Sequence, residues 1–137
     1  MGRKGVRAKT VVNLMKTIID PNQHRAVLTK WYRSPARIWI FDVSLTRLGI
    51  RLARTAEPEV LYIVGASCEH IVGPFSWEAS EMSIVLQAES GKPFDLVMDE
   101  KAGFELRCQG VVLVVGPATE FDKTFTNFLG DPPELGS

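Results

Sequence analysis

Cysteine and histidine, on which much enzyme and metal chemistry depends, are scarce in this sequence. The chain has two of each, Cys68 and Cys108 with His24 and His70. Two cysteines are too few for a disulfide framework, although a single bridge between them stays open. A Ser-His-Asp or Cys-His catalytic system would have to use one of the two histidines. We therefore expect a protein that is not an enzyme and needs no cofactor.

Long apolar segments and phosphate-binding glycine loops are missing as well. The longest apolar run is Val111–Val115, whereas a membrane-spanning helix needs about 20 residues. No uninterrupted apolar segment follows the basic N-terminus, so no secretory signal is predicted. The chain contains neither GxxxxGK[ST] nor GxGxxG, which makes the common classes of nucleotide-using enzyme unexpected. We expect a soluble, cytoplasmic protein that does not attach to membranes.

Charge is present in abundance, but it is sorted along the chain. Residues 1–54 hold twelve of the sixteen Lys and Arg and two of the sixteen acids, so they carry 12 − 2 = +10 and the remainder carries 4 − 14 = −10. One explanation is a basic surface for an anionic partner. A second is that basic early strands lie beside acidic later strands and form cross-strand pairs. A third explanation is that the basic face of one copy of the chain pairs with the acidic face of another copy.

Length and composition fit one domain: 137 residues, of which 45% are hydrophobic and 23% are charged. We expect a flexible basic arm over residues 1–8, a single domain over residues 9–130 and a flexible tail over residues 131–137. A phenylalanine stripe predicts a helix at the end of the domain. Its members are Phe121, Phe125 and Phe128, with Leu129 beside them.

Two helices are predicted before the strands begin. An apolar stripe at helical spacing predicts a short amphipathic helix that ends at Asp20, because Pro21 follows. The stripe comprises Val11, Leu14, Met15, Ile18 and Ile19. A second helix is predicted over residues 22–32, since Asp20 can cap it and Pro21 suits its first position. Its last part, residues 26–32, is also compatible with a strand.

From Pro35 onward the apolar pattern changes to a period of two, which predicts about seven short strands. The candidate segments for these strands number eight: residues 37–41, 45–54, 60–64, 68–72, 82–87, 94–98, 104–109 and 111–115. Two of them, residues 60–64 and 111–115, are apolar on both faces and should lie inside a sheet. The predicted fold is α+β: one antiparallel sheet of about seven strands, flat or curled toward a barrel or sandwich, with N-terminal helices and a C-terminal helix.

Cations and aromatic side chains interleave in the basic half, and this pattern defines the candidate binding surface. Its residues are Trp31, Arg33, Arg37, Trp39, Arg47 and Arg51. The leading hypothesis is a small non-catalytic interaction domain that binds a protein partner or itself as a homo-oligomer. A nucleic-acid-binding domain is the first alternative, because single strands combine base stacking with backbone charge. The pI near 6.7 and the missing RNA-recognition signature weaken it.

A second alternative is a small ligand-binding barrel or enzyme with a site near Cys68, His70, Trp77 and Glu81. Cys68 and His70 are two residues apart, so they would share one face of a strand, and Cys108 could supply a third zinc ligand. Burial is the stronger interpretation for Cys108, because cysteine on an apolar face behaves as a small hydrophobe. We therefore predict no metal site.

Overall fold

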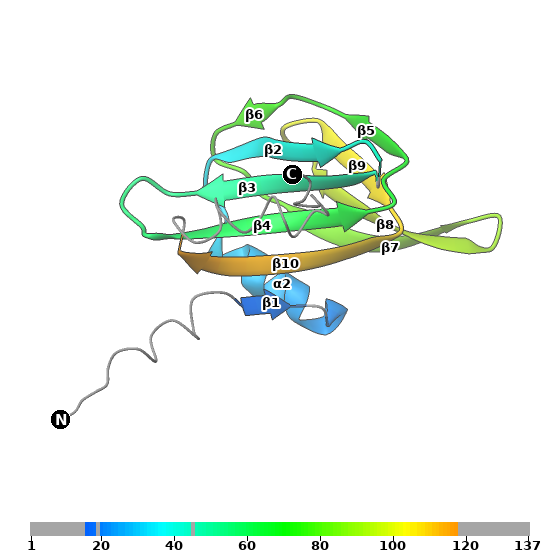
Figure 1. Ribbon diagram of the computed structural model, residues 1–137, viewed down its shortest axis with the longest axis horizontal. Coiled ribbons are helices and arrows are strands. Elements are labelled where there is room, and N and C mark those ends of the chain that lie inside the picture. The colour runs from blue at the N-terminus through cyan, green and yellow to red at the C-terminus, as the bar shows by residue number, and fades with distance from the viewer. Residues whose placement is uncertain (1–15, 19, 45, 118–137) are drawn as a thin grey trace, which may run out of the picture.

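The computed structural model describes residues 16–18, 20–44 and 46–117, which form ten strands and one helix. The strands make two antiparallel sheets that face one another (Figure 1). The larger sheet has the order β1 (Lys16–Ile18), β10 (Gly110–Pro117), β4 (Glu59–Ala66), β3 (Arg47–Ala53), β2 (Ala36–Asp42) and β6 (Ser76–Trp77). The smaller sheet has the order β5 (His70–Val72), β9 (Phe104–Cys108), β8 (Lys92–Asp99) and β7 (Ser83–Glu89).

The prediction of a single seven-strand sheet is therefore wrong, although every predicted strand overlaps an observed one. Each sheet contains its own meander, β2-β3-β4 and β7-β8-β9. The chain leaves the larger sheet after β4 for β5, returns to it for the short β6, leaves it again for β7, β8 and β9, and returns for β10. Because β10 then pairs with both β1 and β4, the two doubly apolar strands lie inside the larger sheet, as predicted.

The only helix in the described ranges is α2 (Pro21–Lys30), which settles the helix-or-strand alternative for this segment. Asp20 caps it, because its carboxylate accepts a 2.9 Å hydrogen bond from the backbone N–H of Asn22. The helix buries His24 and Leu28 and packs near β1 and β7 (Figure 1). No helix in the described part of the chain combines the length and the apolar character needed to cross a membrane.

The predicted first helix is wrong at its end, where residues 16–18 form β1 and pair with β10. The rest of that helix lies outside the described residues. The same is true of the predicted arm over residues 1–8, the phenylalanine stripe of residues 121–129 and the tail over residues 131–137.

The core lies between the two sheets, and the predicted alternation places it correctly. Side chains from β3, β4 and β10 meet side chains from β9, including Ile50, Ile63, Leu113, Phe104 and Leu106. A second apolar cluster lies on the opposite face of β4 and β10. It contains Val60, Tyr62, Val64 and Val114.

One face assignment is wrong, and a β-bulge in β2 is the reason. The alternation predicts that Trp39 and Phe41 share a face, with Ile38 and Ile40 on the other. Ile38 is opposite Ile50, but Ile40 is opposite Gly49, so Trp39 is an extra residue in the ladder. Accordingly Ile38 packs on the main core, whereas Ile40 packs on the second cluster.

Candidate interaction surfaces

Three of the six predicted binding residues come together on the outer face of β2 and β3. Arg37 and Arg51 are directly opposite each other in the antiparallel register. The guanidinium carbon of Arg51 lies 4.5 Å from the ring centroid of Trp39, a distance at which the cation and the ring attract one another. Strand alternation places Trp39 on the face of Arg37, which is the side of the sheet where Arg51 lies.

The other three predicted residues lie elsewhere. Trp31 is only 6% exposed and belongs to the core, because it follows α2 at the C-cap and turns inward. Arg33 lies in the turn after α2 and forms a 3.7 Å ion pair with Glu81. Arg47 begins β3 opposite Asp42, at the far end of the strand. The six residues therefore do not form one surface.

A groove of about 490 Å³ borders the Arg37–Arg51 pair, and we call it the basic groove. Its lining includes Arg37, Arg51, Arg54, Trp77 and the carboxylate-bearing Glu78, so three guanidinium groups outnumber one acid. Arg54 is held in place by two hydrogen bonds. Its Nε donates to Ser34 Oγ at 2.9 Å, and its terminal nitrogen donates to the Lys30 carbonyl.

The predicted cross-strand pairing of basic and acidic strands is wrong in its topology. Basic β2 and β3 are neighbours in the larger sheet, while acid-bearing β7, β8 and β9 form the smaller sheet. Much of the opposite charge therefore lies on two different sheets, with Arg47 opposite Asp42 on β3 and β2 as an exception. Arg33–Glu81 is an ion pair that does join the basic part of the chain to the acidic part.

A shallow, open pocket of about 640 Å³ lies on the outer face of the smaller sheet. Strand register places four side chains in one row across this face: His70, Arg107, Leu96 and Val85. We call this surface, with the neighbouring Glu69, Gln87, Glu89, Phe94 and Glu105, the acidic face. Phe94 and Leu96 form its apolar floor.

Arg107 contacts several other residues of the acidic face. Its guanidinium carbon lies 3.9 Å from the ring centroid of Phe94, and its Nε lies 3.2 Å from a Glu69 oxygen. It also pairs with Glu89, and Gln109 donates a 2.9 Å hydrogen bond to the second Glu69 oxygen. The hydrogen bond to Glu89 is the main reason that the pKa of Arg107 is raised. Exposed ion pairs of this kind contribute little to stability. They do hold the carboxylates of Glu69 and Glu89 close to Arg107.

The acidic face has an excess of negative charge. Glu69, Glu89 and Glu105 supply three carboxylates, whereas Arg107 and Lys92 supply two cationic groups. The exposed side chains of Val72 and Val85 lie beside this group, at the outer strands of the sheet. The result is an apolar floor with an acidic rim.

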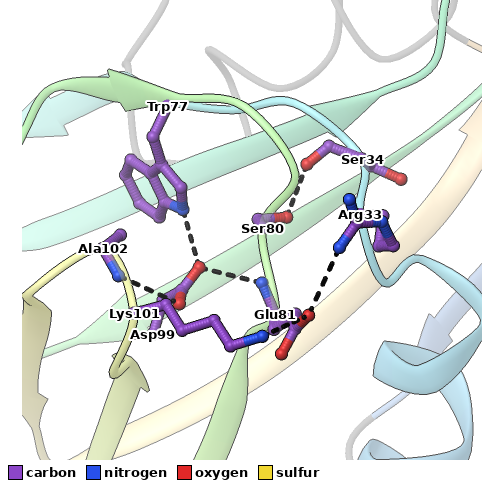
Figure 2. A network of polar contacts seen from close by, with 8 residues as sticks. All are labelled: Arg33, Ser34, Trp77, Ser80, Glu81, Asp99, Lys101 and Ala102. Atoms are coloured by element: carbon purple, nitrogen blue, oxygen red, sulfur yellow. Dashed lines mark hydrogen bonds and ion pairs between the residues drawn. The ribbon is translucent and has the colours of Figure 1, made fainter.

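A separate polar network ties three loops together around the buried carboxylate of Asp99 (Figure 2). This carboxylate accepts hydrogen bonds from Trp77 Nε1 at 2.7 Å, the Glu81 N–H at 2.8 Å and the Ala102 N–H at 3.4 Å. The Glu81 side chain pairs with Lys101 at 3.3 Å. These hydrogen bonds satisfy the buried carboxylate and hold the three loops together.

The predicted ligand or enzyme site near Cys68 and His70 is not assembled. The strand begins at His70, so Cys68 lies outside it and the two side chains do not share a strand face. His70 lines the acidic face, whereas Cys68 points toward Cys108 and Gly65. Trp77 packs on Phe104 with ring centroids 4.8 Å apart. Among the described residues, no three His, Cys, Asp or Glu side chains are placed to bind a metal ion together.

The acidic face is the surface that sequence reasoning missed. The alternation correctly predicts that Glu105 and Arg107 point outward from β9. Phe94 and Leu96 also alternate with their neighbours, and this signal was present in the sequence. Only the strand register shows that these side chains meet Glu69 and His70 from another strand.

Comparisons of the chain with protein-family models, with curated proteins and with solved structures gave no significant match. Function must therefore be argued from the surfaces themselves.

Proposed function

We propose that this domain is a non-catalytic interaction module that binds a basic, partly apolar segment of a protein partner on the acidic face. The observation that carries the proposal is the 640 Å³ pocket, in which an apolar floor is combined with an acidic rim. Mixed surfaces of this kind suit protein recognition, because apolar contacts supply burial and charges supply orientation.

The chemistry of the partner follows from the charges of the face. A Lys or Arg of the partner would pair with Glu69 or Glu105, and an apolar side chain beside it would cover Phe94 and Leu96. Arg107 and Lys92 already compensate part of the negative charge, so the partner segment needs only a modest positive excess. Because the pocket is shallow and open, we expect a transient complex whose association rate falls as salt is added.

The test is an NMR titration of the full chain, labelled with ¹⁵N, with an extended peptide of alternating Lys and Leu. We expect shift changes that are concentrated on β5, β8 and β9 and that shrink at high salt. A peptide of alternating Glu and Leu is the matched control and should leave these signals unchanged. Changes confined to other elements, or equal changes with both peptides, would contradict the proposal.

A pair of charge reversals sharpens this test. Glu105 lies on the acidic face, whereas Glu57 lies in the exposed turn between β3 and β4. We expect Glu105→Lys to weaken binding of the Lys–Leu peptide several-fold, and Glu57→Lys, which changes the net charge equally, to have much less effect. Equal weakening by both would indicate a response to net charge rather than a defined face.

The basic groove supports a second candidate function, the binding of an anionic chain such as single-stranded nucleic acid. The favouring observation is that Arg37 and Arg51 are directly opposite in the ladder, an arrangement that is destabilising for like charges. Natural sequences depart from such local rules most often at functional sites. Trp39 beside Arg51 adds a ring on which a base could stack.

Fluorescence anisotropy with a labelled single-stranded oligonucleotide tests this second function. We expect binding at low salt that weakens when Arg37 is replaced by Ala. Arg25→Ala is the matched control, because Arg25 is an exposed arginine on α2. Absence of binding at micromolar protein, or equal weakening by both variants, would reject the basic groove as the site.

A further inference from the structure

Two of the four crossings between the sheets, β4 to β5 and β9 to β10, pass through one corner of the molecule. The β4–β5 segment leaves the larger sheet with Ser67 in a left-handed conformation, φ 51°. The β9–β10 segment returns to the larger sheet immediately after Cys108. Cys68 and Cys108 are therefore brought together from segments about 40 residues apart.

Backbone hydrogen bonds fix these two segments against each other. The Gln109 N–H donates to the Ala66 carbonyl at 2.9 Å, and the Glu69 N–H donates to the Arg107 carbonyl at 2.8 Å. The two bonds lie on either side of the cysteines. A covalent link at this position would join segments that the backbone already holds side by side.

The sulfur atoms meet over the bare α-carbon of Gly65. A Cβ at this glycine would lie 3.0 Å from Cys108 Sγ and 3.2 Å from Cys68 Sγ. The two thiols also form a hydrogen bond with each other. Both sulfurs lie within 3.2 Å of the same point beside Gly65, and an S–S bond is about 2.05 Å long, so the two sulfurs must move closer together for a disulfide to form.

The two thiols differ in access and in acidity. Cys68 is half-buried, and its hydrogen bond with Cys108 lowers the pKa of its thiol. Cys108 is fully buried, and its pKa is raised by the hydrogen bond to Cys68, by burial and by the charge of Asp95. A half-buried sulfur with a lowered pKa beside a second, protonated sulfur is an arrangement found at redox-responsive cysteines.

We propose that Cys68 and Cys108 are a hydroperoxide-responsive dithiol that closes to an intramolecular disulfide. The Cys68 thiolate attacks the peroxide O–O bond and takes one oxygen, which gives a sulfenic acid, and the other oxygen leaves with a proton as an alcohol or as water. The Cys108 sulfur then attacks Cys68 sulfur, and the hydroxyl leaves with the Cys108 proton as water. Two thiols and one hydroperoxide thus give one disulfide, one alcohol (water, if the oxidant is hydrogen peroxide) and one water.

Reduction restores the starting state, because an added dithiol exchanges with the new bond and is itself oxidised to a cyclic disulfide. The dithiol requires no partner on the acidic face. Failure of the redox proposal would therefore leave the proposed peptide binding untouched, and failure of peptide binding would leave the redox proposal untouched. The dithiol is nevertheless close to the acidic face in the sequence. Glu69 immediately follows Cys68, Arg107 immediately precedes Cys108, and both residues help to form that face.

The first experiment uses the reduced full chain, treated with hydrogen peroxide and then alkylated. Trypsin should give separate peptides 55–101 and 108–123, which carry one cysteine each. We expect the oxidised sample to yield these two peptides linked, with an intact mass lower by two hydrogen atoms, and a dithiol to separate them again. If both cysteines are alkylated when the peroxide-treated protein is unfolded, or if the linked species is a dimer, the proposal is wrong.

Single substitutions assign the two roles. In Cys108→Ala we expect Cys68 to stop at the sulfenic acid, which a 1,3-dione traps, and in Cys68→Ala we expect Cys108 to remain a thiol. Circular dichroism reports whether each variant folds. If a variant does not fold, the same dione applied to the wild-type protein during oxidation should label Cys68 alone. Label on Cys108 instead of Cys68 would overturn the assignment.

Discussion

The indole Nε1 of Trp77 donates a 2.7 Å hydrogen bond to the carboxylate of Asp99, and this bond joins the short edge strand β6 to the end of β8 (Figure 2). Asp99 is only 2% exposed, so its carboxylate must be stabilised by protein donors rather than by water. The backbone N–H groups of Glu81 and Ala102 donate the other two hydrogen bonds to this carboxylate. Asp99, at the end of β8, therefore links β6, the segment at Glu81 and the β8–β9 turn.

Asp99→Ala should destabilise the domain by about 3 kcal/mol or more, because it leaves the Trp77 and Glu81 donors without their acceptor, at roughly 1–3 kcal/mol for each buried group. Urea unfolding followed by tryptophan fluorescence measures the loss. Glu100→Ala, one residue further along on the exposed turn, is the matched control and should change stability by less than about 0.5 kcal/mol. Similar losses in both variants would mean that Asp99 is not a structural centre.

The sequence predicts the strands well because alternation directly records which side chains face the core. In β9, Phe104 and Leu106 are buried while Glu105 is exposed, as its pattern requires. The same signal does not say which strands pair. The corner at Ser67 and the bulge at Trp39 carry no distinctive residue pattern, so the division into two sheets and the change of face in β2 were not predictable.

The candidate site shows the same limit. Arg37 and Arg51 come together because two neighbouring strands form a hairpin, which alternation could suggest. The prediction that Trp31 belongs to a binding surface is wrong, because Trp31 is buried. It lies at the C-cap of α2, where the turn after the helix sets the direction of the side chain and neither helical nor strand periodicity applies. The acidic face gathers residues from four strands and the segment before β5, so it exists only once the register is known.

Gly65→Ala should destabilise the domain by about 1–3 kcal/mol, since the new methyl group would crowd Cys108 Sγ at 3.0 Å and Cys68 Sγ at 3.2 Å. The cost should be smaller when the same change is made in a Cys108→Ala background, because the nearest atom is then gone. Denaturant unfolding of the four proteins gives this coupling energy. Gly110→Ala, where a Cβ would meet nothing within 4 Å, is the control; equal costs at both glycines would contradict the crowding.

Oxidation of Cys68 and Cys108 should stabilise the domain, because a bond between residues about 40 positions apart restricts the unfolded chain. The loop-closure model gives an upper value of about 4 kcal/mol for a loop of this length. Thermal unfolding of the peroxide-treated and the dithiol-treated protein measures the difference. A lower midpoint for the oxidised protein would show that the bond strains the corner rather than fastening it.

Asp95→Asn should stabilise the domain at neutral pH. Burial raises the pKa of the Asp95 carboxyl above its ordinary value of 3.8, with the charge of His24 acting in the opposite direction. A raised folded-state pKa means that the favourable state is the protonated one, so wild-type stability is lost as pH increases from 3.8 through the folded value. The advantage of Asn should therefore be present at pH 7 and should disappear as pH falls below 3.8. Urea midpoints measured from pH 3 to pH 8 test this, with Glu57→Gln as the control for loss of one carboxylate; an advantage that persists at pH 3 would mean that the gain does not come from ionisation.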